Sequence, residues 1–482
     1  MSRSPLTVVE EIRGRSTGLA LAVVCAAQFM VVLDISVVNV ALPSIRESLG
    51  FDSGGLAWVV NAYALTFAGF LLLGGRLADL LGRRRIFLIG LTVFSGASLV
   101  GGLVDSAALL VGARAIQGLG AAILAPATLT ILTATFPEGP RRTRALATWT
   151  AVGIAGGTAG NLVGGVLTEY LTWRSTLLIN VPIGLAAVLL TVRQIAADRP
   201  SGPRPRLDFA GAILATGGLG ALAYGIAQAA DGGWSTRPTI VGVVIGVSLL
   251  AAFVVVEKWV SSSPLIPLHI FRNRAVSVGN VVMLLAGACL NPMWYFLTLS
   301  MQNLLGYSPV QTGLAFLPHT VVAIAVGAGL TPWLMGRIDG RVLIAAGSLV
   351  AAAGFWWQAQ LGADSSYLQG ILLPAIVFSV GSGMLNTPIT AAVTSGISAA
   401  DAGAASGLMN TTKQIGGALG LSVLVAYVAT SSTDKEVVLA AYNHAFYAIA
   451  AAMVVAAFVA LALPAHRDES NLDGMKRDEQ TE

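Results

Sequence analysis

The sequence predicts an all-α integral membrane protein with fourteen membrane-spanning helices. Of its 482 residues, 55% are hydrophobic and only 11% are charged, whereas a soluble domain carries about 25% charged residues. Apolar runs of about 18 or more residues recur along the chain, and each is long enough to cross a hydrocarbon core about 30 Å thick. Basic residues gather in alternate loops, which supports the number of crossings.

Short polar connections separate the fourteen apolar spans. They lie at about 17–43, 55–75, 86–104, 107–132, 145–168, 175–194, 208–229, 238–257, 275–299, 310–335, 341–360, 368–391, 405–428 and 440–463. An even number of spans places both ends of the chain on the same side of the membrane.

Lysine and arginine residues are distributed unequally between the two sides of these spans. Two of the 28 lie inside spans, and 22 lie on the side that carries the termini. The other side has only four, which are Arg46, Arg174, Arg237 and Lys435. Because cytoplasmic loops carry the excess of basic residues, we expect both termini in the cytoplasm.

The spans divide the chain into two six-helix blocks with two helices between them. We expect a cytoplasmic N-terminus at 1–16, a bundle at 17–194, a Pro-rich cytoplasmic linker at 195–207, two inserted helices at 208–257, a cytoplasmic linker at 258–274, a second bundle at 275–463 and a cytoplasmic tail at 464–482. The charged tail is expected to be disordered.

An internal repeat relates the two blocks. The charged stretch 74–85 has a weaker copy at 336–341, and each follows the second span of its block. Glycines of span 5, at 156–165, likewise match those of span 13, at 416–420. Repeated halves around a central site are a common plan of secondary transporters.

Asp34 is the only carboxylate well inside any of the first six spans. An ionisable group near the middle of a membrane costs about 2.5–3.5 kcal/mol on insertion scales and is a functional candidate. Burial disfavours its charged form and the fixed charge of Arg114 in span 4 favours it, so the two residues could couple to protons. The alternatives are a structural ion pair, an Arg114 satisfied by carbonyls, or an acid that contacts a cationic substrate.

Other polar and aromatic residues inside spans are candidates for substrate contacts. They are Asn39, Asn61, Tyr63, Gln117, Asn161, Trp294, Trp357 and Lys413. Gln117 shares a helix face with Arg114 because the two are three residues apart. Tryptophans near span ends are more often interfacial anchors, and His319 in span 10 is more often structural.

Several function classes find no support in the sequence. There is no Gly-x-x-x-x-Gly-Lys-Ser/Thr loop, which argues against direct use of ATP, and the four histidines and two cysteines have no metal-ligand spacing. Basic residues are dispersed in short loops, which argues against nucleic-acid binding. We therefore expect no enzymatic activity, no metal and no cofactor.

Four stretches resemble signatures of the major facilitator superfamily. The stretch 75–85 is similar to the motif between helices 2 and 3 of that family, Gly-x-Leu-Ala-Asp-x-x-Gly-Arg-Arg/Lys-Arg. The stretches 33–43, 114–121 and 173–184 are similar to signatures of its branch of fourteen-helix drug:proton antiporters. One position departs from that branch, because Asn161 stands where its helix 5 usually has a proline, which weakens the antiport signature.

The resemblance implies a major facilitator fold of two pseudo-symmetric six-helix bundles plus two additional central helices. It implies a proton-coupled exporter of amphipathic small molecules that works by alternating access in a bacterial cytoplasmic membrane. Asp34 and Arg114 would couple transport to protons, while Gly75, Asp79, Gly82 and Arg83 would gate the two halves. The expected partners are the substrate, protons and lipid, and we expect a monomer.

Other functions remain open for this fold. One is a narrow-substrate exporter of a self-made antibiotic, a metabolite or a lipid, and another is an uptake facilitator. A membrane sensor that transports nothing is disfavoured because no loop is long enough for a soluble domain. Substrate identity, transport direction, proton stoichiometry and the effect of Asn161 do not follow from the sequence.

Overall fold

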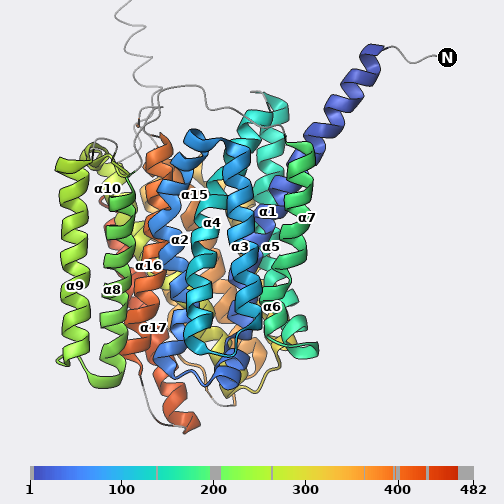
Figure 1. The fold of residues 1–482 in the computed structure, drawn as a ribbon. Coiled ribbons are helices and arrows are strands. Elements are labelled where there is room, and N and C mark those ends of the chain that lie inside the picture. Colours follow the sequence, from blue (N-terminus) through green and yellow to red (C-terminus); the bar gives the residue numbers. More distant parts are fainter. Residues whose placement is uncertain are drawn as a thin grey trace, which may run out of the picture.

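The fold is a bundle of membrane-length helices that run side by side (Figure 1). The computed structural model describes residues 5–136, 139–195, 208–261, 264–362, 364–394, 397, 402–429, 432 and 434–464. Within these ranges the side chains at 5–16, 53, 78–80, 143, 194, 230–232, 394 and 402–403 are not described. All but the first residue of the expected linker at 195–207 and of the expected tail at 464–482 lie outside the described residues.

The first half of the chain forms six membrane-length rods. They are α1 (Pro5–Leu49), α2 (Ser53–Leu81), α3 (Arg83–Leu103), α4 (Ala107–Thr135), α5 (Pro140–Tyr170) and a rod interrupted at Ile179 that comprises α6 (Arg174–Leu178) and α7 (Asn180–Gln194). The helix α1 begins at Pro5, so part of the segment expected as a polar N-terminal tail is helical.

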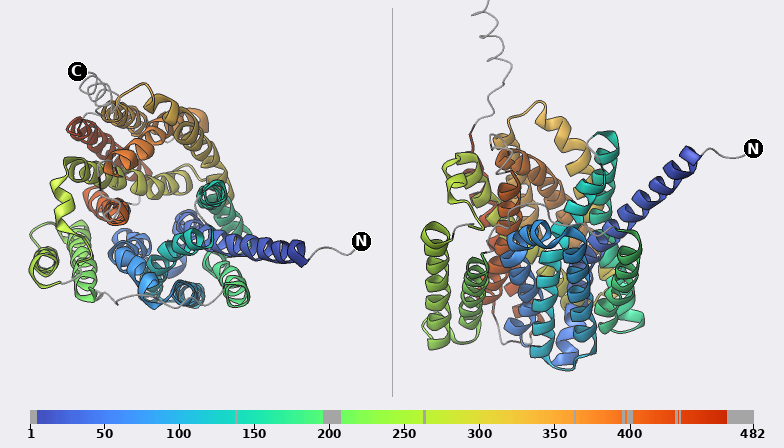
Figure 2. Two further views of the ribbon diagram at one scale, coloured as in Figure 1. Left: turned by 90° about the horizontal axis from the view of Figure 1, so that it is seen from above. Right: turned by 45° about the horizontal axis from the view of Figure 1, so that its top comes forward.

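Two helices follow, α8 (Phe209–Gly232) and α9 (Arg237–Val255), and α9 continues into the π-helical turn η1 (Val256–Val260). They pack against each other, and α8 also packs against α2 and α16. These helices are central in the sequence but lie at one edge of the bundle, beside both halves (Figure 2).

The second half begins after the short helix η2 (Leu268–Arg272) and also contains six rods. They are α10 (Arg274–Leu299) with η3 (Ser300–Leu304); α11 (Pro309–Ala315), α12 (Leu317–Ile324), η4 (Ala325–Leu330) and α13 (Thr331–Met335) in one broken rod; α14 (Gly340–Gln358); η5 (Leu368–Leu372) with α15 (Leu373–Thr394); α16 (Ala402–Tyr427); and α17 (Lys435–Ala460).

Helix pairing is equivalent in the two halves, in agreement with the internal repeat. In the first half α1 packs on α5 and α3 packs on α4, and in the second half the corresponding rods pair in the same way, α10 on α16 and α14 on α15. The halves form two groups side by side when the molecule is seen from above (Figure 2). They meet mainly where α2 packs on α16 and where α5 packs on α11.

Thirteen helices in the described part of the chain are long and apolar enough to cross a membrane. The one expected span that is not among them is the thirteenth, which corresponds to α16; this helix has 26 residues but carries Asn410, Lys413 and Gln414 in its first half. It packs on α10, α2 and α8, so its polar residues need not face lipid. Thirteen of the fourteen expected spans are thus confirmed as long and apolar enough to cross a membrane, and α16 supplies a fourteenth rod of similar length within the bundle.

The charged stretch 74–85 forms the end of α2, a tight turn and the start of α3. Gly82 has φ +91°, a left-handed conformation that side chains rarely adopt. Gly74 faces α4 so closely that an added Cβ would lie 2.1 Å from the carbonyl oxygen of Ala122. An added Cβ at Gly75 would make only an ordinary contact of 3.8 Å with Pro126.

We therefore predict that Gly74→Ala lowers stability whereas Gly75→Ala does not. The new methyl group at position 74 would push α2 away from α4, and such overpacking typically costs about 1–3 kcal/mol. Thermal unfolding of the purified protein in detergent measures the effect. Equal melting temperatures for the two variants would show that α2 and α4 are not in backbone contact at this level.

Candidate functional site

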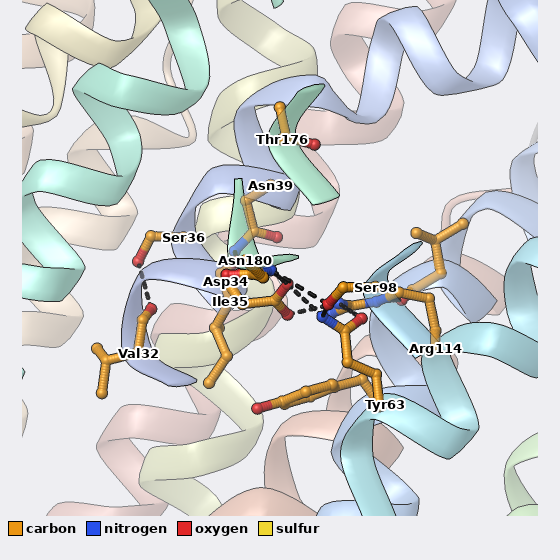
Figure 3. Close-up of polar contacts among 12 residues, drawn as sticks. Val32, Asp34, Ile35, Ser36, Asn39, Tyr63, Ser98, Arg114, Thr176 and Asn180 are labelled. Carbon is orange, nitrogen blue, oxygen red and sulfur yellow. Dashed lines mark hydrogen bonds and ion pairs between the residues drawn. The ribbon is translucent and has the colours of Figure 1, made fainter. Parts of the chain in front are cut away.

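A buried ion pair joins α1 to α4. The Nη1 of Arg114 lies 2.5 Å from Oδ2 of Asp34. Asp34 is 0% exposed and Arg114 is 2% exposed, so this is not a surface pair that water would screen. Figure 3 shows the two side chains meeting between their helices. The predicted partnership of Asp34 with Arg114 is present in the structure.

Two amides complete the environment of the Asp34 carboxylate. The Nε2 of Gln117 donates to Oδ1 over 2.6 Å, and the Nδ2 of Asn180 donates to the same oxygen over 2.8 Å. Together with Arg114, these residues direct three hydrogen bonds at one carboxylate. An ionised carboxylate can only accept hydrogen bonds, and such charge-assisted bonds are the strong ones.

The Arg114 guanidinium also contacts α2. Its Nε donates to the carbonyl oxygen of Val59 over 3.1 Å, and its central carbon lies 4.5 Å from the centroid of the Tyr63 ring. Nη1 donates in addition to Oε1 of Gln117 over 2.7 Å. Tyr63 is buried, and its hydroxyl has no hydrogen-bond partner among the described residues. The ring lies beneath the network in Figure 3.

Ser98 of α3 forms a second layer behind the amides. Its hydroxyl accepts hydrogen bonds from Nε2 of Gln117 over 2.7 Å and from Nδ2 of Asn180 over 3.4 Å. The network therefore draws on α1, α2, α3, α4 and α7, all in the first half of the chain. No residue of the second half takes part in the described contacts of Asp34 and Arg114.

Small residues allow the helices to approach closely enough for these contacts. An added Cβ at Gly118 would lie 2.3 Å from the carbonyl oxygen of Tyr63, which explains the glycine beside Gln117. On the other side of Asp34, an added Cβ at Gly160 would lie 2.8 Å from the carbonyl oxygen of Leu33. Such packing through small residues is typical of membrane helices.

Sequence reasoning missed Asn180 and Ser98. Asn180 is the first residue of α7, just after the break between α6 and α7, and this break sets its position toward Asp34. It lies within the stretch 173–184 that we used only for the family resemblance. An asparagine inside an apolar span indicates a functional position by itself, so Asn180 could have been found from the sequence. Ser98 could not, because serine is common in membrane helices.

The other asparagines predicted for substrate contact lie apart from this network. The Nδ2 of Asn39 donates to the carbonyl oxygen of Ile35 in its own helix over 3.0 Å. The Nδ2 of Asn61 donates to the hydroxyl oxygen of Ser422 over 2.9 Å, and this hydrogen bond links α2 to α16 in the other half. Asn161 is buried and its Oδ1 has no partner among the described residues.

The aromatic candidates of the second half differ in their surroundings. Trp294 packs against Phe316 and His319, with ring centroids 4.7 and 4.9 Å apart. His319 is buried and bonded to the Ser379 hydroxyl, which fits its structural interpretation. Trp357 is 39% exposed at the end of α14, as expected of an interfacial anchor, and its role in substrate binding stays a prediction.

Lys413 lies in α16, partly buried, and forms no ion pair with any described residue. The carbonyl oxygen of Lys413 would lie 2.2 Å from a Cβ added at Gly287 of α10. Beside Lys413, the Oε1 of Gln414 accepts a hydrogen bond from the Nδ2 of Asn291 of α10 over 3.5 Å. These residues place polar groups in the second half without any acid to match Asp34.

The predicted gating motif is described in part. Gly82 forms the turn and Arg83 begins α3, while the side chain of Asp79 lies outside the described residues. Arg76 donates to the carbonyl oxygen of Pro264 over 2.5 Å. In the copy at 336–341, Asp339 caps α14 by accepting the Arg341 backbone N–H over 2.9 Å, and its carboxylate also lies 3.3 Å from the Arg341 guanidinium.

These observations define the class of protein. Two helical bundles of matching design, with membrane-length rods and a fully buried ionic network in one of them, have the organisation of a secondary transporter. The sequence matches the Major Facilitator Superfamily over residues 24–421. The chain therefore belongs to the Major Facilitator Superfamily.

Curated relatives cover most of the chain. It is 53% identical over 449 residues to the cephamycin export protein CmcT of Amycolatopsis lactamdurans, which covers 92% of each chain. It is 40% identical over 446 residues to the puromycin resistance protein pur8 of Streptomyces alboniger, which covers 90% of this chain and 88% of that one. Both are similar to this chain along nearly their whole length.

Among solved structures, the fold is similar to that of the peptide transporter POT in complex with sulfate. The TM-score is 0.69, and the match covers 92% of this chain and 94% of that one. The sequence identity is only 17%, so this likeness speaks for the fold alone.

We predict that Asn180→Ala destabilises the protein more than Asn39→Ala does. Asn180 donates to the buried carboxylate, and hydrogen bonds to charged groups are worth about 1.5–3 kcal/mol, against about 1 kcal/mol for the bond of Asn39 to its own helix. Thermal unfolding of both variants in the same detergent makes the comparison. A larger loss for Asn39→Ala would contradict the assigned role of Asn180.

Proposed function

We propose that the protein exports amphipathic small molecules, antibiotics among them, across the bacterial cytoplasmic membrane in exchange for protons. The observation that carries the proposal is the fully buried Asp34, bonded to Arg114, Gln117 and Asn180. A carboxylate so placed is costly in a membrane protein and is a functional site by default. The proposal includes no enzymatic activity and no cofactor.

The network suggests how a proton is coupled to the two halves. A proton on Asp34 would remove its charge and release Arg114 from the ion pair, while Arg114 would keep its contacts with Val59 and Tyr63 of α2. The same helix holds Asn61, which bonds Ser422 of the other half. A change of charge at Asp34 would therefore act on the helix that joins the halves.

One feature supports a cytoplasmic position of both termini, and another supports an arrangement in which the halves are closed toward the outside. The excess of basic residues lies on the side of the termini. Close contacts between α5 and α11 lie in the last third of α5, away from the N-terminus of the chain. There the Glu169 carboxylate accepts a hydrogen bond from the backbone N–H of Val310 over 2.9 Å. A Cβ added at Gly313 of α11 would lie 2.4 Å from the carbonyl oxygen of Asn161 of α5.

The proton gradient is an adequate source of energy, because one elementary charge moved through 100 mV is worth about 2.3 kcal/mol. We propose that the protein acts as a monomer, since the network and the interface between the halves are built within one chain. Lipid would surround the outer faces, where apolar side chains of α9 such as Val244 and Val247 are exposed.

A narrow substrate range is the second candidate. The names of the two relatives each refer to one antibiotic, cephamycin or puromycin, and this favours export of a particular compound over general multidrug efflux. A panel of antibiotics tested for protection of an efflux-deficient host, with and without an uncoupler, separates the two. Protection against one chemical class alone would favour the narrow exporter.

We predict that Asp34→Asn reduces proton-coupled efflux at least about tenfold while the protein still inserts, because the amide cannot carry a proton between states. Uptake of puromycin or a cephamycin from the medium into energised inverted vesicles, with a dye for internal pH, measures both fluxes. Asp105→Asn is the matched control, since Asp105 is an exposed acid paired with Arg174 at the surface. Export by Asp34→Asn at the rate of the parent would exclude Asp34 as the coupling site.

A second prediction concerns the gating motif. We expect Asp79→Asn to slow turnover without changing the order of substrate preference, because the motif lies at the turn that follows α2, a helix that packs on α16 of the other half, and not in the network. Initial rates for several compounds in the same vesicles measure both properties. A changed preference with normal turnover would contradict a gating role.

A further inference from the structure

A cavity of about 330 Å³ lies at one end of the second half, apart from the Asp34 network. It is enclosed by the end of α10 with η3, the last turn of α16 and the first turns of α17, and Arg46 of α1 completes its wall. Its volume is at the small end of ligand pockets, which range over about 300–1,000 Å³.

Two cations line this cavity, Arg46 and Lys435, and its described lining contains no acid. They are two of only four basic residues on the side of the spans away from the termini. Of the other two, Arg174 pairs with Asp105, and Arg237 begins α9. Basic residues are scarce on an extracellular face. Two of them, Arg46 and Lys435, nevertheless come from opposite ends of the chain to line the same cavity.

Neither cation forms an ion pair within the part of the chain that the structure describes. Of the nearby acids, Glu47 and Glu436 are exposed chain neighbours of the two cations and lie outside the lining. Two others are engaged elsewhere. Asp434 accepts the backbone N–H of Glu436 as the N-cap of α17, and Asp52, within electrostatic range of Tyr295 in the cavity wall, accepts the backbone N–H of Gly55 as the N-cap of α2. The described lining of the cavity therefore contains two positive charges and no acid.

The rest of the wall is apolar and aromatic. Phe296, Leu299 and Val425 are buried hydrophobic residues, and Tyr442 is bonded to Asn303. Lys435 is exposed and so lies toward the mouth of the cavity. A ligand that matches this lining combines an apolar body with an anionic head group.

We propose that this cavity binds an anionic amphipathic molecule, with a carboxylate or similar head group held by Arg46 and Lys435. Because Arg46 belongs to the first half and the other lining residues to the second, the site is complete only while the halves are together at this end. By linkage, an anion bound here stabilises that closed arrangement. The inference goes beyond the proposed export activity, and binding can be measured without transport.

The test uses the full-length protein in phosphatidylcholine nanodiscs, titrated with octanoate and with its neutral analogue octanamide by calorimetry, with empty nanodiscs as the blank. We expect saturable binding of octanoate and much weaker binding of octanamide. Arg46→Gln and Lys435→Gln should each weaken octanoate binding at least about fivefold, because each removes a charge-assisted hydrogen bond. Arg237→Gln, a basic residue of the same side outside the cavity, should bind like the parent.

A second titration in nanodiscs that contain phosphatidylglycerol identifies the source of the anion. If phosphatidylglycerol competes with octanoate, the site exists and its ligand is a lipid head group. If phosphatidylglycerol does not compete, the site exists and its ligand is a free amphipathic anion. Equal affinities for octanoate and octanamide, or parental affinity in both cavity variants, would overturn the proposal. An Asp34→Asn protein that binds octanoate normally but exports nothing would separate this site from the coupling site.

Discussion

The structure depends on a buried ion pair that its surroundings must satisfy. Asp34 and Arg114 have almost no exposed surface, and removing one partner of such a pair typically costs about 3–5 kcal/mol because a charge is left unpaired. Replacing both with apolar residues is often neutral for stability. The pair is therefore better explained by a function that needs charge inside the membrane than by a need for stability.

Close helix packing is what makes this pair possible. The carboxylate on α1 receives donors from α4 and α7, which lie close to it. Glycines bring the neighbouring helices together, Gly118 where α4 meets α2 and Gly160 where α5 meets α1. The helix α2 has a particular place in this arrangement. It contacts Arg114 through Val59 and Tyr63, and it bonds the other half through Asn61.

The sequence was sufficient to predict much of this arrangement. Hydropathy and loop charge predicted the helices, and even the polar α16 was found because the alternation of basic loops required a span there. The pairing of Asp34 with Arg114 followed from the cost of burying an acid. Helical spacing placed Gln117 on the same face as Arg114, but its hydrogen bond to Asp34 was not predicted, since we had assigned Gln117 to substrate contact.

Other features needed three-dimensional information. Asn180 reaches Asp34 because the rod is broken at Ile179, and nothing in the composition of that span indicates which way the asparagine points. Of the two glycines at the start of the charged stretch, Gly74 and not Gly75 packs closely on α4, because rotation about the helix axis decides which residue faces α4. The gating role of Gly75 stays a prediction. The cavity that joins Arg46 to Lys435 unites distant segments, and no local pattern predicts it.

The central claim is that Asp34 binds and releases the transported proton. The most direct test adds an exported compound to the purified protein in weakly buffered detergent solution and follows proton release with an indicator dye. If substrate and proton compete, the parent should release about one proton for each molecule bound, and Asp34→Asn should release none. The same proton release from both proteins would contradict the account.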